Sequence, residues 1–486
     1  MDRAALASVL IGLLLATRAG AVPIPQDPLA DPVPAYVGAP AVPERVRARR
    51  IPQHPFMAAN GVSNIHDDGY QSDTYAAPGP LGRTPAVIST LQQAECASVT
   101  FDRQGRLVTI CVGVEGPRLA RFDPVTLELE AVFPLPPRTN GSGNVFSDFS
   151  GGGYFYLDHL DRVVTPTNTR QVWIVAETDD ATGFALERVH DLTGVVPLGD
   201  SVISVLPDWS GRLWFATVQA RVGTIDPESG AVQVTTLDGE AIGNSFAVDD
   251  TGGVFIVSDH ALYRFDADAD GAPAVTWREA YDRGTRLKPG QTNFGSGTTP
   301  TLMGRNWVAI TDNADPYMQV VVYWRRARFS RPRHLCSVAV FGADAGATEN
   351  SLMGTHRSLV VENNYGYSGL TSVMNGATTE PGLARIDVRA SSCRLRWTSP
   401  ERVPSVVSKL SLATGLVYTY TKDPGPNATD AWYLTTIDFR SGATVWKQLV
   451  GTGFGYNNNF APVTLGRDGT AYVGVLGGLT ATRDAP

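Results

Sequence analysis

The sequence predicts an all-β fold: a single β-propeller of eight four-stranded blades, closed with help from the N-terminal segment. Three observations support this prediction. A strand–turn–strand unit recurs roughly every 40 to 60 residues, its turns contain Asp and Gly, and no stretch of useful length has a helical period. With 49 Gly, 33 Pro and only 18% charged residues, the composition excludes a coiled coil or a disordered tail. The length of 486 residues is then explained by one closed ring rather than by separate domains.

The first turn of each unit joins two apolar strands through Asp and Gly. It occurs in residues 98–110, 204–216, 246–257 and 462–473. Gly supplies the positive φ that such a hairpin needs. We expect these first turns near residues 105, 152, 211, 252, 304, 354, 415 and 469, which gives eight blades, with seven as the alternative count.

A second turn follows in most units, with the pattern Asp-x-x-Ser/Thr-Gly after an apolar strand. It is clear in residues 223–230 and 436–446 and in related form at 120–126, and weaker copies begin at Asp266 and Asp387. The Asp side chain can accept a hydrogen bond from the backbone two residues further on. Two hairpins joined by a loop make one four-stranded blade.

Residues 1–21 are predicted to be a secretory signal peptide. Arg3 is followed by an apolar run over residues 4–16 and by small residues at 19–21. That run is too short to span a bilayer comfortably, so a membrane anchor is the less favoured alternative. No Cys follows the cleavage site, which argues against a lipid anchor. Residues 22–84 are expected to form a Pro/Ala-rich arm that packs on the propeller of residues 85–486, and the protein is expected to be secreted or periplasmic.

The four cysteines are expected to form two disulfides, because an even number in an exported chain favours pairing. Three pairings are possible. We favour Cys96 with Cys111, because they lie on two strands joined by one tight turn. Cys336 with Cys393 then follows by elimination.

The net charge and the distribution of charged residues argue against some classes of binding partner. The net charge is −8 and no block of Lys or Arg occurs, which argues against nucleic acid or an anionic membrane as the main partner. No later stretch of the sequence is apolar enough to span a membrane. We therefore expect a monomer that binds a small molecule.

Several units resemble known propeller repeats. Residues 384–397 and 437–474 look like repeats of the quinoprotein (PQQ-dehydrogenase-like) propellers, and residues 243–266 are similar to the SMP-30/gluconolactonase and paraoxonase propellers. The resemblance covers about residues 90–484. It implies a propeller fold, and an activity of either the metal-assisted hydrolase or the quinone-dependent oxidoreductase type.

In a propeller, the residues just before each first strand converge on one mouth of the central channel, and the loops after the second strands reach the same face. The residues at the first strands are polar: Glu95, Asn144, Asp200, Asn244, Ser296, Glu349, Asn350, Ser408, Lys409 and Asn459. The second-strand loops add Glu115, Asp259, His260, Asp312, Asn313, Glu362, Asn363, Asn364, Lys422 and Asp423.

Carboxylates mixed with Asn amides are oxygen ligands that suit Ca²⁺ better than a transition metal. The resemblance to lactonase propellers implies that Asn244 and Asn350 hold such an ion, which would polarise a substrate carbonyl. The expected metal set is Glu95, Asn144, Asn244, Asp312, Asn313, Glu349, Asn350 and Asn459. The alternative is that Asn and Asp stand at these positions because they cap turns well.

His260, next to Asp259 on the same face, is the candidate general base. Adjacent residues at a strand end should point apart, so the two are not expected to form a dyad. A second polar cluster, His66, Asp67 and Asp68, precedes the blades and would complete a site if it lay across the channel. The alternative is an ordered arm that only closes the ring.

The sequence thus favours a metal-dependent hydrolase of the lactonase type that acts on a small organic molecule. A non-catalytic binding propeller is the first alternative and a PQQ-dependent oxidoreductase the second. A quinone site usually has channel Trp and Arg residues and often adjacent cysteines, and the chain has no Cys-Cys pair. Motifs of the GxSxG, P-loop and HExxH types are also absent from the sequence.

Overall fold

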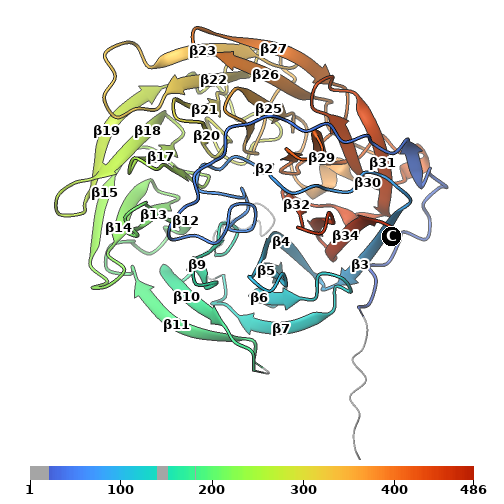
Figure 1. Ribbon diagram of the computed structural model, residues 1–486, viewed down its shortest axis with the longest axis horizontal. Coiled ribbons are helices and arrows are strands. Elements are labelled where there is room, and N and C mark those ends of the chain that lie inside the picture. The colour runs from blue at the N-terminus through green and yellow to red at the C-terminus, as the bar shows by residue number, and fades with distance from the viewer. Residues whose placement is uncertain (1–20, 139–150, 181, 486) are drawn as a thin grey trace, which may run out of the picture.

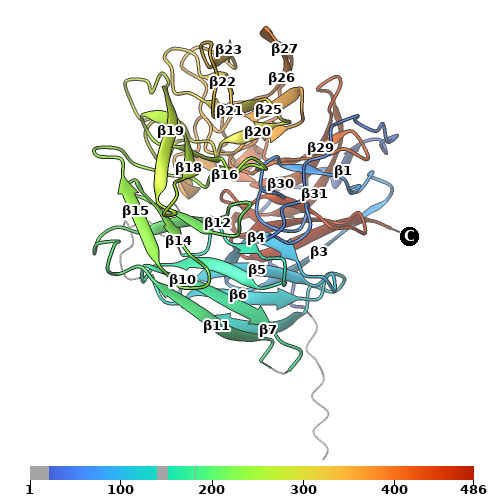
Figure 2. The ribbon, with the colours of Figure 1, turned by 60° about the vertical axis from the view of Figure 1, so that its left-hand side comes forward.

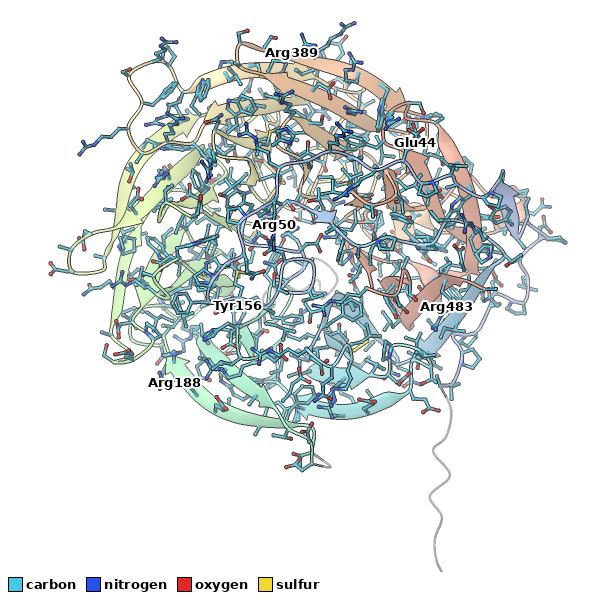
Figure 3. The ribbon with its side chains drawn as sticks, in the orientation of Figure 1. Glu44, Arg50, Tyr156, Arg188, Arg389 and Arg483 are labelled. Atoms are coloured by element: carbon cyan, nitrogen blue, oxygen red, sulfur yellow. A yellow bond between two sulfur atoms is a disulfide. The ribbon has the colours of Figure 1, made fainter. Side chains whose placement is uncertain are left out.

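The computed structural model describes residues 21–138, 151–180 and 182–485. They form a ring of eight sheets around a central channel, antiparallel except where β2 joins one of them, so the predicted fold and blade count are confirmed (Figure 1). Seven sheets have four strands and one has six. Figure 3 shows Tyr156 towards the centre of the ring and Arg188 and Arg389 at its rim.

The first four blades follow the chain in order. Blade 1 contains β4 (Ala94–Phe101), β5 (Leu107–Gly113), β6 (Gly116–Phe122) and β7 (Leu129–Pro134). Blade 2 contains β8 (Tyr156–Leu157), β9 (Val163–Thr167), β10 (Gln171–Glu177) and β11 (Phe184–Asp191). Blade 3 contains β12 (Val202–Pro207), β13 (Leu213–Thr217), β14 (Arg221–Ile225) and β15 (Val232–Thr236). Blade 4 contains β16 (Ala247–Val248), β17 (Val254–Val257), β18 (Ala261–Ala267) and β19 (Pro273–Ala280).

The other four blades complete the ring. Blade 5 contains β20 (Thr301–Met303), β21 (Trp307–Thr311), β22 (Gln319–Trp324) and β23 (His334–Ala339). Blade 6 contains β24 (Met353–Gly354), β25 (Ser358–Glu362), β26 (Leu383–Arg389) and β27 (Ser392–Ser399). Blade 7 contains β28 (Lys409–Ser411), β29 (Leu416–Thr421), β30 (Ala431–Asp438) and β31 (Thr444–Thr452), with β1 (Tyr36–Gly38) and β2 (Thr74–Tyr75) at its two edges. Blade 8 contains β32 (Val463–Leu465), β33 (Ala471–Val475), β34 (Gly478–Asp484) and β3 (Pro85–Leu91). Three short 3₁₀ helices lie in loops: η1 (Leu370–Val373), η2 (Pro426–Ala428) and η3 (Phe454–Tyr456).

The predicted turns form as their sequences require. In the first hairpin of blade 4, the Asp249 carboxylate accepts hydrogen bonds from the amides of Thr251 and Gly253, both at 2.9 Å, and Gly252 has φ 87°. In the second hairpin of blade 7, the Asp438 carboxylate accepts a hydrogen bond from the Ser441 amide at 2.7 Å. In both of these turns, Asp starts the turn and Gly stands at its end.

One first hairpin differs from the prediction. In blade 2 the turn lies between β8 and β9, at residues 158–162, and not near residue 152. Asp158 accepts hydrogen bonds from the amides of Leu160 and Arg162, and Asp161 occupies the left-handed position with φ 64°. Asp tolerates this conformation better than most residues, so the turn needs no Gly.

The ring closes by pairing the two ends of the propeller sequence. β3 pairs antiparallel with β34 over seven residue pairs, from Pro85 with Asp484 to Leu91 with Gly478. In both views the blue strand β3 lies beside the red C-terminal strands (Figures 1 and 2). Blade 8 thus combines a strand from the start of the propeller sequence with three strands from its end, and this pairing closes the ring.

Residues 57–75, here called the channel segment, run through the centre of the ring. Backbone hydrogen bonds tie the segment to the innermost strands of five blades: Leu157 N–H to Ser63, Val248 N–H to Gly69, Leu302 N–H to Tyr70, Gly354 N–H to Ser72, and Leu410 N–H to Asp73. Upstream of it, the Glu44 amide donates to the Thr414 carbonyl and the Arg49 amide to His356 Nδ1. Thr414 and His356 lie in first hairpins, so the arm reaches the channel from the first-hairpin side.

Both predicted disulfides are present. Cys96 and Cys111 lie opposite each other on β4 and β5, and Cys336 and Cys393 join the outer strands β23 and β27 of neighbouring blades. Two disulfides indicate an oxidising, extracytoplasmic compartment. The predicted signal peptide lies almost wholly outside the described residues. Within the described part of the chain, no helix has the length and apolarity needed to cross a membrane.

Candidate functional site

A cavity lies at the centre of the ring, where the channel segment meets the starts of several blades. Its volume is about 50 Å³, enough for about three or four water-sized groups. The polar residues that line it come from the channel segment and from blades 1, 2, 5, 6 and 8: His66, Glu95, Ser98, Tyr154, Thr299, Glu349, Asn350, Ser351 and Asn459. The cavity is therefore the place where sequence-distant polar groups meet.

His66 is the one imidazole at this cavity among the described residues, and its side chain is 2% exposed. Its Nδ1 lies 3.2 Å from both carboxylate oxygens of Asp73 and 2.9 Å from Ser351 Oγ. An ionised carboxylate can only accept, so Nδ1 carries the proton. In the neutral imidazole, Nε2 is then the nitrogen that can accept a proton, and it has no hydrogen-bond partner within the described part of the chain.

Lys409 keeps Asp73 in its ionised form. Both side chains are 0% exposed, and the Lys409 ammonium donates to an Asp73 carboxylate oxygen and to the Ile65 carbonyl. Burial alone would raise the pKa of Asp73, but the Lys409 ammonium and the contact with His66 together outweigh burial and lower it. A buried ion pair thus fixes the charge behind His66.

A second buried carboxyl group, that of Asp67, lies next to the Lys409–Asp73 pair. Its carboxylate lies 3.6 Å from the Lys409 ammonium, and burial raises the pKa of Asp67 to about 8. Burial likewise raises the pKa of Asp68, which accepts a hydrogen bond from Ser72 Oγ, to about 7. At neutral pH and below, protonation of Asp67 leaves the Lys409–Asp73 pair with no net charge.

Ser351 does not stand where a nucleophile would. Its hydroxyl donates to the Asp73 carboxylate and lies on the Nδ1 side of His66, not on the Nε2 side. A serine nucleophile has to be hydrogen-bonded to the nitrogen that takes its proton, while the carboxylate holds the other nitrogen. Ser351 therefore orients the His66–Asp73 pair.

Two carboxyl groups from distant parts of the sequence line the cavity, one from blade 1 and one from the start of blade 6. Glu95 Oε2 accepts a hydrogen bond from Asn459 Nδ2 at 3.0 Å, and burial raises the pKa of Glu95 to about 8 although Arg138 acts in the opposite direction. Glu349 accepts hydrogen bonds from the amide and the hydroxyl of Thr292, both at 2.9 Å, and burial raises its pKa to about 8 as well. Both carboxyls are therefore mostly protonated at neutral pH.

A further carboxyl lies just behind the lining. Glu362 accepts hydrogen bonds from Asn350 Nδ2 at 2.9 Å and from the Ser408 amide at 2.7 Å. Burial raises the pKa of Glu362 to about 7. Glu362 thereby holds the amide of Asn350, which does line the cavity.

Of the residues predicted from the sequence, five line this cavity: His66, Glu95, Glu349, Asn350 and Asn459. Asp67, Glu362 and Lys409 lie directly behind them. Asn244 is one contact away, because its Oδ1 accepts a hydrogen bond from the Tyr154 hydroxyl at 3.3 Å. Asn144 lies outside the described residues.

Four further predicted mouth residues stabilise loops away from the cavity. Asp200 pairs with Arg221 at 2.8 Å, Asp312 accepts from the Gln319 amide at 2.7 Å, Asn313 donates to the Arg283 carbonyl, and Asn363 donates to the Ala345 carbonyl. For these four residues the turn-capping alternative describes the observed contacts.

His260 and Asp259 are not among the described residues that line the cavity; they lie in the loop between β17 and β18. Contrary to the expectation that their side chains point apart, His260 Nδ1 lies 2.8 Å from the Asp259 carboxylate. Arg283 donates to both His260 Nε2 at 2.5 Å and Asp259 at 2.7 Å. This cation occupies the nitrogen that a general base would use.

Two parts of the site were not predicted from the sequence. Asp73 and Ser351 hold His66, and Tyr154 forms a wall of the cavity. Asp73 belongs to the same polar stretch as His66, which is a usable signal. Tyr154 follows a Gly-rich run and resembles any strand aromatic.

Calcium stays a prediction for this site. Among the described residues, no group of three His, Cys, Asp or Glu side chains could hold a metal ion, and Asn144 of the expected metal set lies outside these residues. The two lining carboxyls accept hydrogen bonds from Asn459 and Thr292. A quinone cofactor likewise stays a prediction; no Trp or Arg lines the cavity within the described part of the chain.

No protein-family model matches this chain. An uncharacterised protein of Archaeoglobus fulgidus is 27% identical over 363 residues, which cover 68% of this chain and 69% of that protein. Among solved structures, BamB from Moraxella catarrhalis matches with a TM-score of 0.44 and 12% identity, covering 91% of this chain and 97% of its own. A streptogramin B lyase matches with a TM-score of 0.42 and 8% identity, covering 88% and 99%. The virginiamycin B lyase of Staphylococcus aureus matches with a TM-score of 0.41 and 8% identity, covering 69% and 94%.

Proposed function

We propose that the protein is an extracytoplasmic hydrolase that acts on a small organic ester or lactone, with His66 as its general base. The observation that supports this proposal is the state of His66 at the central cavity. Asp73 holds its protonated Nδ1, and Nε2 has no partner among the described residues. This is the arrangement of an oriented base.

The chemistry follows from the groups that surround the cavity. His66 Nε2 takes a proton from a water molecule while the water oxygen bonds to the acyl carbon. Ionised Asp73 stabilises the imidazolium that forms, because it lies 3.2 Å from Nδ1. The imidazolium then returns the proton to the leaving alkoxide as the acyl C–O bond breaks. The products are a carboxylic acid and an alcohol.

Glu95 supplies the electrophilic group in this scheme. Its raised pKa, about 8, keeps it protonated at neutral pH, and a carboxylic acid O–H can donate a hydrogen bond to the carbonyl oxygen of the substrate. Since the cavity has room for only three or four water-sized groups, the substrate has to be small or has to reach the cavity with one end only.

The test compares two histidines. His66→Gln keeps a donor towards Asp73 but has no basic nitrogen, and His260→Gln alters the other candidate base. With para-nitrophenyl acetate and γ-butyrolactone as probes, we expect His66→Gln to lower kcat by roughly 10²- to 10⁴-fold and His260→Gln to leave it unchanged. Circular dichroism and Tm control for folding. Absence of hydrolysis by the wild type, or loss of activity in His260→Gln alone, would overturn the proposal.

Ligand binding without turnover is the second candidate function. Glu349 accepts two hydrogen bonds from Thr292, and Glu362 accepts hydrogen bonds from Ser408 and Asn350, so part of the polar network is already satisfied by protein groups. A ligand that raises the Tm of the wild type without being converted would favour this function.

A further inference from the structure

One wall of the central cavity combines a buried carboxyl group with an aromatic ring. Glu349 is 8% exposed and lines the cavity together with Tyr154. Burial raises the pKa of the Tyr154 hydroxyl, and the charge of Glu349 raises it further, which places the two groups within electrostatic range of each other. The proposed hydrolysis assigns no role to either side chain.

The Glu349 carboxylate retains the capacity to accept further hydrogen bonds. Each of its oxygens accepts one hydrogen bond from Thr292, but an ionised carboxylate offers about four acceptor directions. Burial raises the pKa of Glu349 and hydrogen bonds from Thr292 and Asn293 lower it, and no Lys or Arg stands beside it among the described lining residues.

The whole cavity is acidic in character. Two of its lining residues are Glu, and no Lys or Arg lines it in the described part of the chain. The nearest cations are already committed: Lys409 pairs with Asp73, and Arg138 lies near Glu95. A positively charged guest would therefore meet two carboxyl groups and no like charge.

The aromatic rings favour the same kind of guest. Tyr154 and Phe460 both line the cavity, and a cation over an aromatic face gains electrostatic energy from the ring quadrupole. The unpartnered Nε2 of His66, a side chain 98% removed from solvent, also lies at this cavity and indicates that a polar ligand completes it.

We infer that the ligand of this cavity carries a primary ammonium group, which pairs with Glu349 and rests against Tyr154. The inference deepens the proposed function, because it names the substrate class of the same site: an ester or lactone with an amine a few bonds from the acyl carbon. The cavity volume of about 50 Å³ suits an ammonium group and its adjoining carbon atoms.

Charge pairing has a measurable consequence. Without a ligand, burial keeps Glu349 largely protonated at neutral pH, since its pKa is about 8. An ammonium ion beside it stabilises the ionised form. Binding should therefore release a proton from the protein, in contrast to the binding of a neutral molecule.

The experiment measures binding directly and needs no turnover. Ethylammonium chloride, calcium chloride, sodium chloride and sodium acetate are compared at matched ionic strength by thermal unfolding. At ten times Kd, we expect ethylammonium to raise Tm by about 1 to 2 °C over sodium chloride, and acetate to have no such effect. Calorimetry in two buffers of different ionisation enthalpy should show release of a proton.

Glu349→Gln removes the ionisable group at nearly constant shape, and Asp312→Asn is the matched control, because Asp312 is also a buried carboxyl but holds a loop away from the cavity. Ethylammonium binding should weaken at least tenfold in Glu349→Gln and persist in Asp312→Asn. Equal stabilisation by acetate, stabilisation by calcium but not by ethylammonium, or unchanged binding in Glu349→Gln would overturn the inference. If ethylammonium binds as expected but His66→Gln keeps full hydrolytic activity, the proposed function fails and the ammonium site stands.

Discussion

Nδ1 of His66 lies 3.2 Å from both carboxylate oxygens of Asp73, and this contact occurs inside one short loop of the channel segment. Both residues precede the first blade in sequence, yet they occupy the centre of the ring. The blades supply the surroundings: Lys409 of β28 neutralises Asp73, and Ser351 precedes β24 and binds both partners. The reactive group of the proposed site thus belongs to the segment that fills the channel, not to a blade.

Replacing Asp73 with Asn should cost stability as well as function. Lys409, at 0% exposure, would keep only the more distant Asp67 carboxyl, 3.6 Å away, as a partner, and breaking a buried pair costs about 3–5 kcal/mol. Urea unfolding measures the loss. The double variant Asp73→Asn/Lys409→Met removes both charges and should recover part of the loss. A double variant no more stable than Asp73→Asn would contradict the assigned ion pair.

Stability should fall as pH rises. Glu95 and Glu349 have a pKa of about 8 in the folded protein and 4.5 ordinarily, so between these values the folded state binds more protons than the unfolded state. The free energy of unfolding must then decrease with increasing pH across this window. Each unit of pKa difference corresponds to about 1.4 kcal/mol per group.

Urea unfolding at several pH values between about 4.5 and 8 would measure this slope. The variant Glu95→Gln/Glu349→Gln should flatten the profile, because glutamine does not titrate. A wild-type protein that gains stability towards pH 8 would show that these carboxyls are ionised in the fold.

The disulfide between blades 5 and 6 should stabilise the ring. Cys336 and Cys393 are 57 residues apart, and closing a loop of this size stabilises a protein by about 2–4 kcal/mol through the unfolded state. Replacing both with Ser should lower Tm by several degrees. The same replacement of Cys96 and Cys111, which close a loop of 15 residues, should cost less by the same entropic reasoning. A larger loss from the shorter loop would mean that packing, not chain entropy, dominates.

Closure of the ring should depend on β3. Ile88 pairs with Ala481 of β34, and Ile88→Pro would remove hydrogen bonding at the centre of this strand. We expect a loss of about 3 kcal/mol or more in the free energy of unfolding, with a gain in oligomers as the edge of β34 becomes available. Size-exclusion chromatography with light scattering detects the oligomers. Val42→Pro, at a position in the arm that is 83% exposed, is the control and should change neither quantity.

Chelation should leave the protein unchanged. Because no three His, Cys, Asp or Glu side chains converge among the described residues, we expect EDTA to shift neither Tm nor the hydrolysis of the probe esters. The measurement is a melting curve and a rate before and after dialysis, with calcium restored afterwards. A chelator-sensitive protein that calcium rescues would restore the metal-assisted mechanism.

The fold could be predicted from the sequence because each hairpin turn is determined by residues that are close together in the chain. Asp at the start and Gly at the end of a hairpin are fixed by the backbone of that hairpin alone, as Asp249 and Gly252 show. The blade 2 turn was misplaced because Asp161 takes the left-handed position and the Gly residues lie several positions earlier. Local chemistry can be satisfied in more than one way, and the sequence does not say which.

The sequence predicted residues of the site only at positions where the propeller topology alone determines their location. Glu95, Glu349 and Asn459 reach the cavity because each stands at the start of a first strand. His260 does not line the cavity, and Arg283 binds its Nε2. The spacing of residues in the sequence does not predict that contact. The pairing of Asp73 with Lys409 spans 336 residues and depends on how the channel segment is seated.

The seating of the channel segment also constrains how the molecule assembles. The segment is made early, but its partners on blades 6 and 7 are made some 280 to 340 residues later, as the Ser351–Asp73 and Lys409–Asp73 contacts show. β3 must likewise wait for β34, the last strand of the chain. Contacts of such long range make folding slow. The ring therefore cannot close around its centre until nearly the whole polypeptide has been delivered, and the polar residues of the future site remain solvated until then.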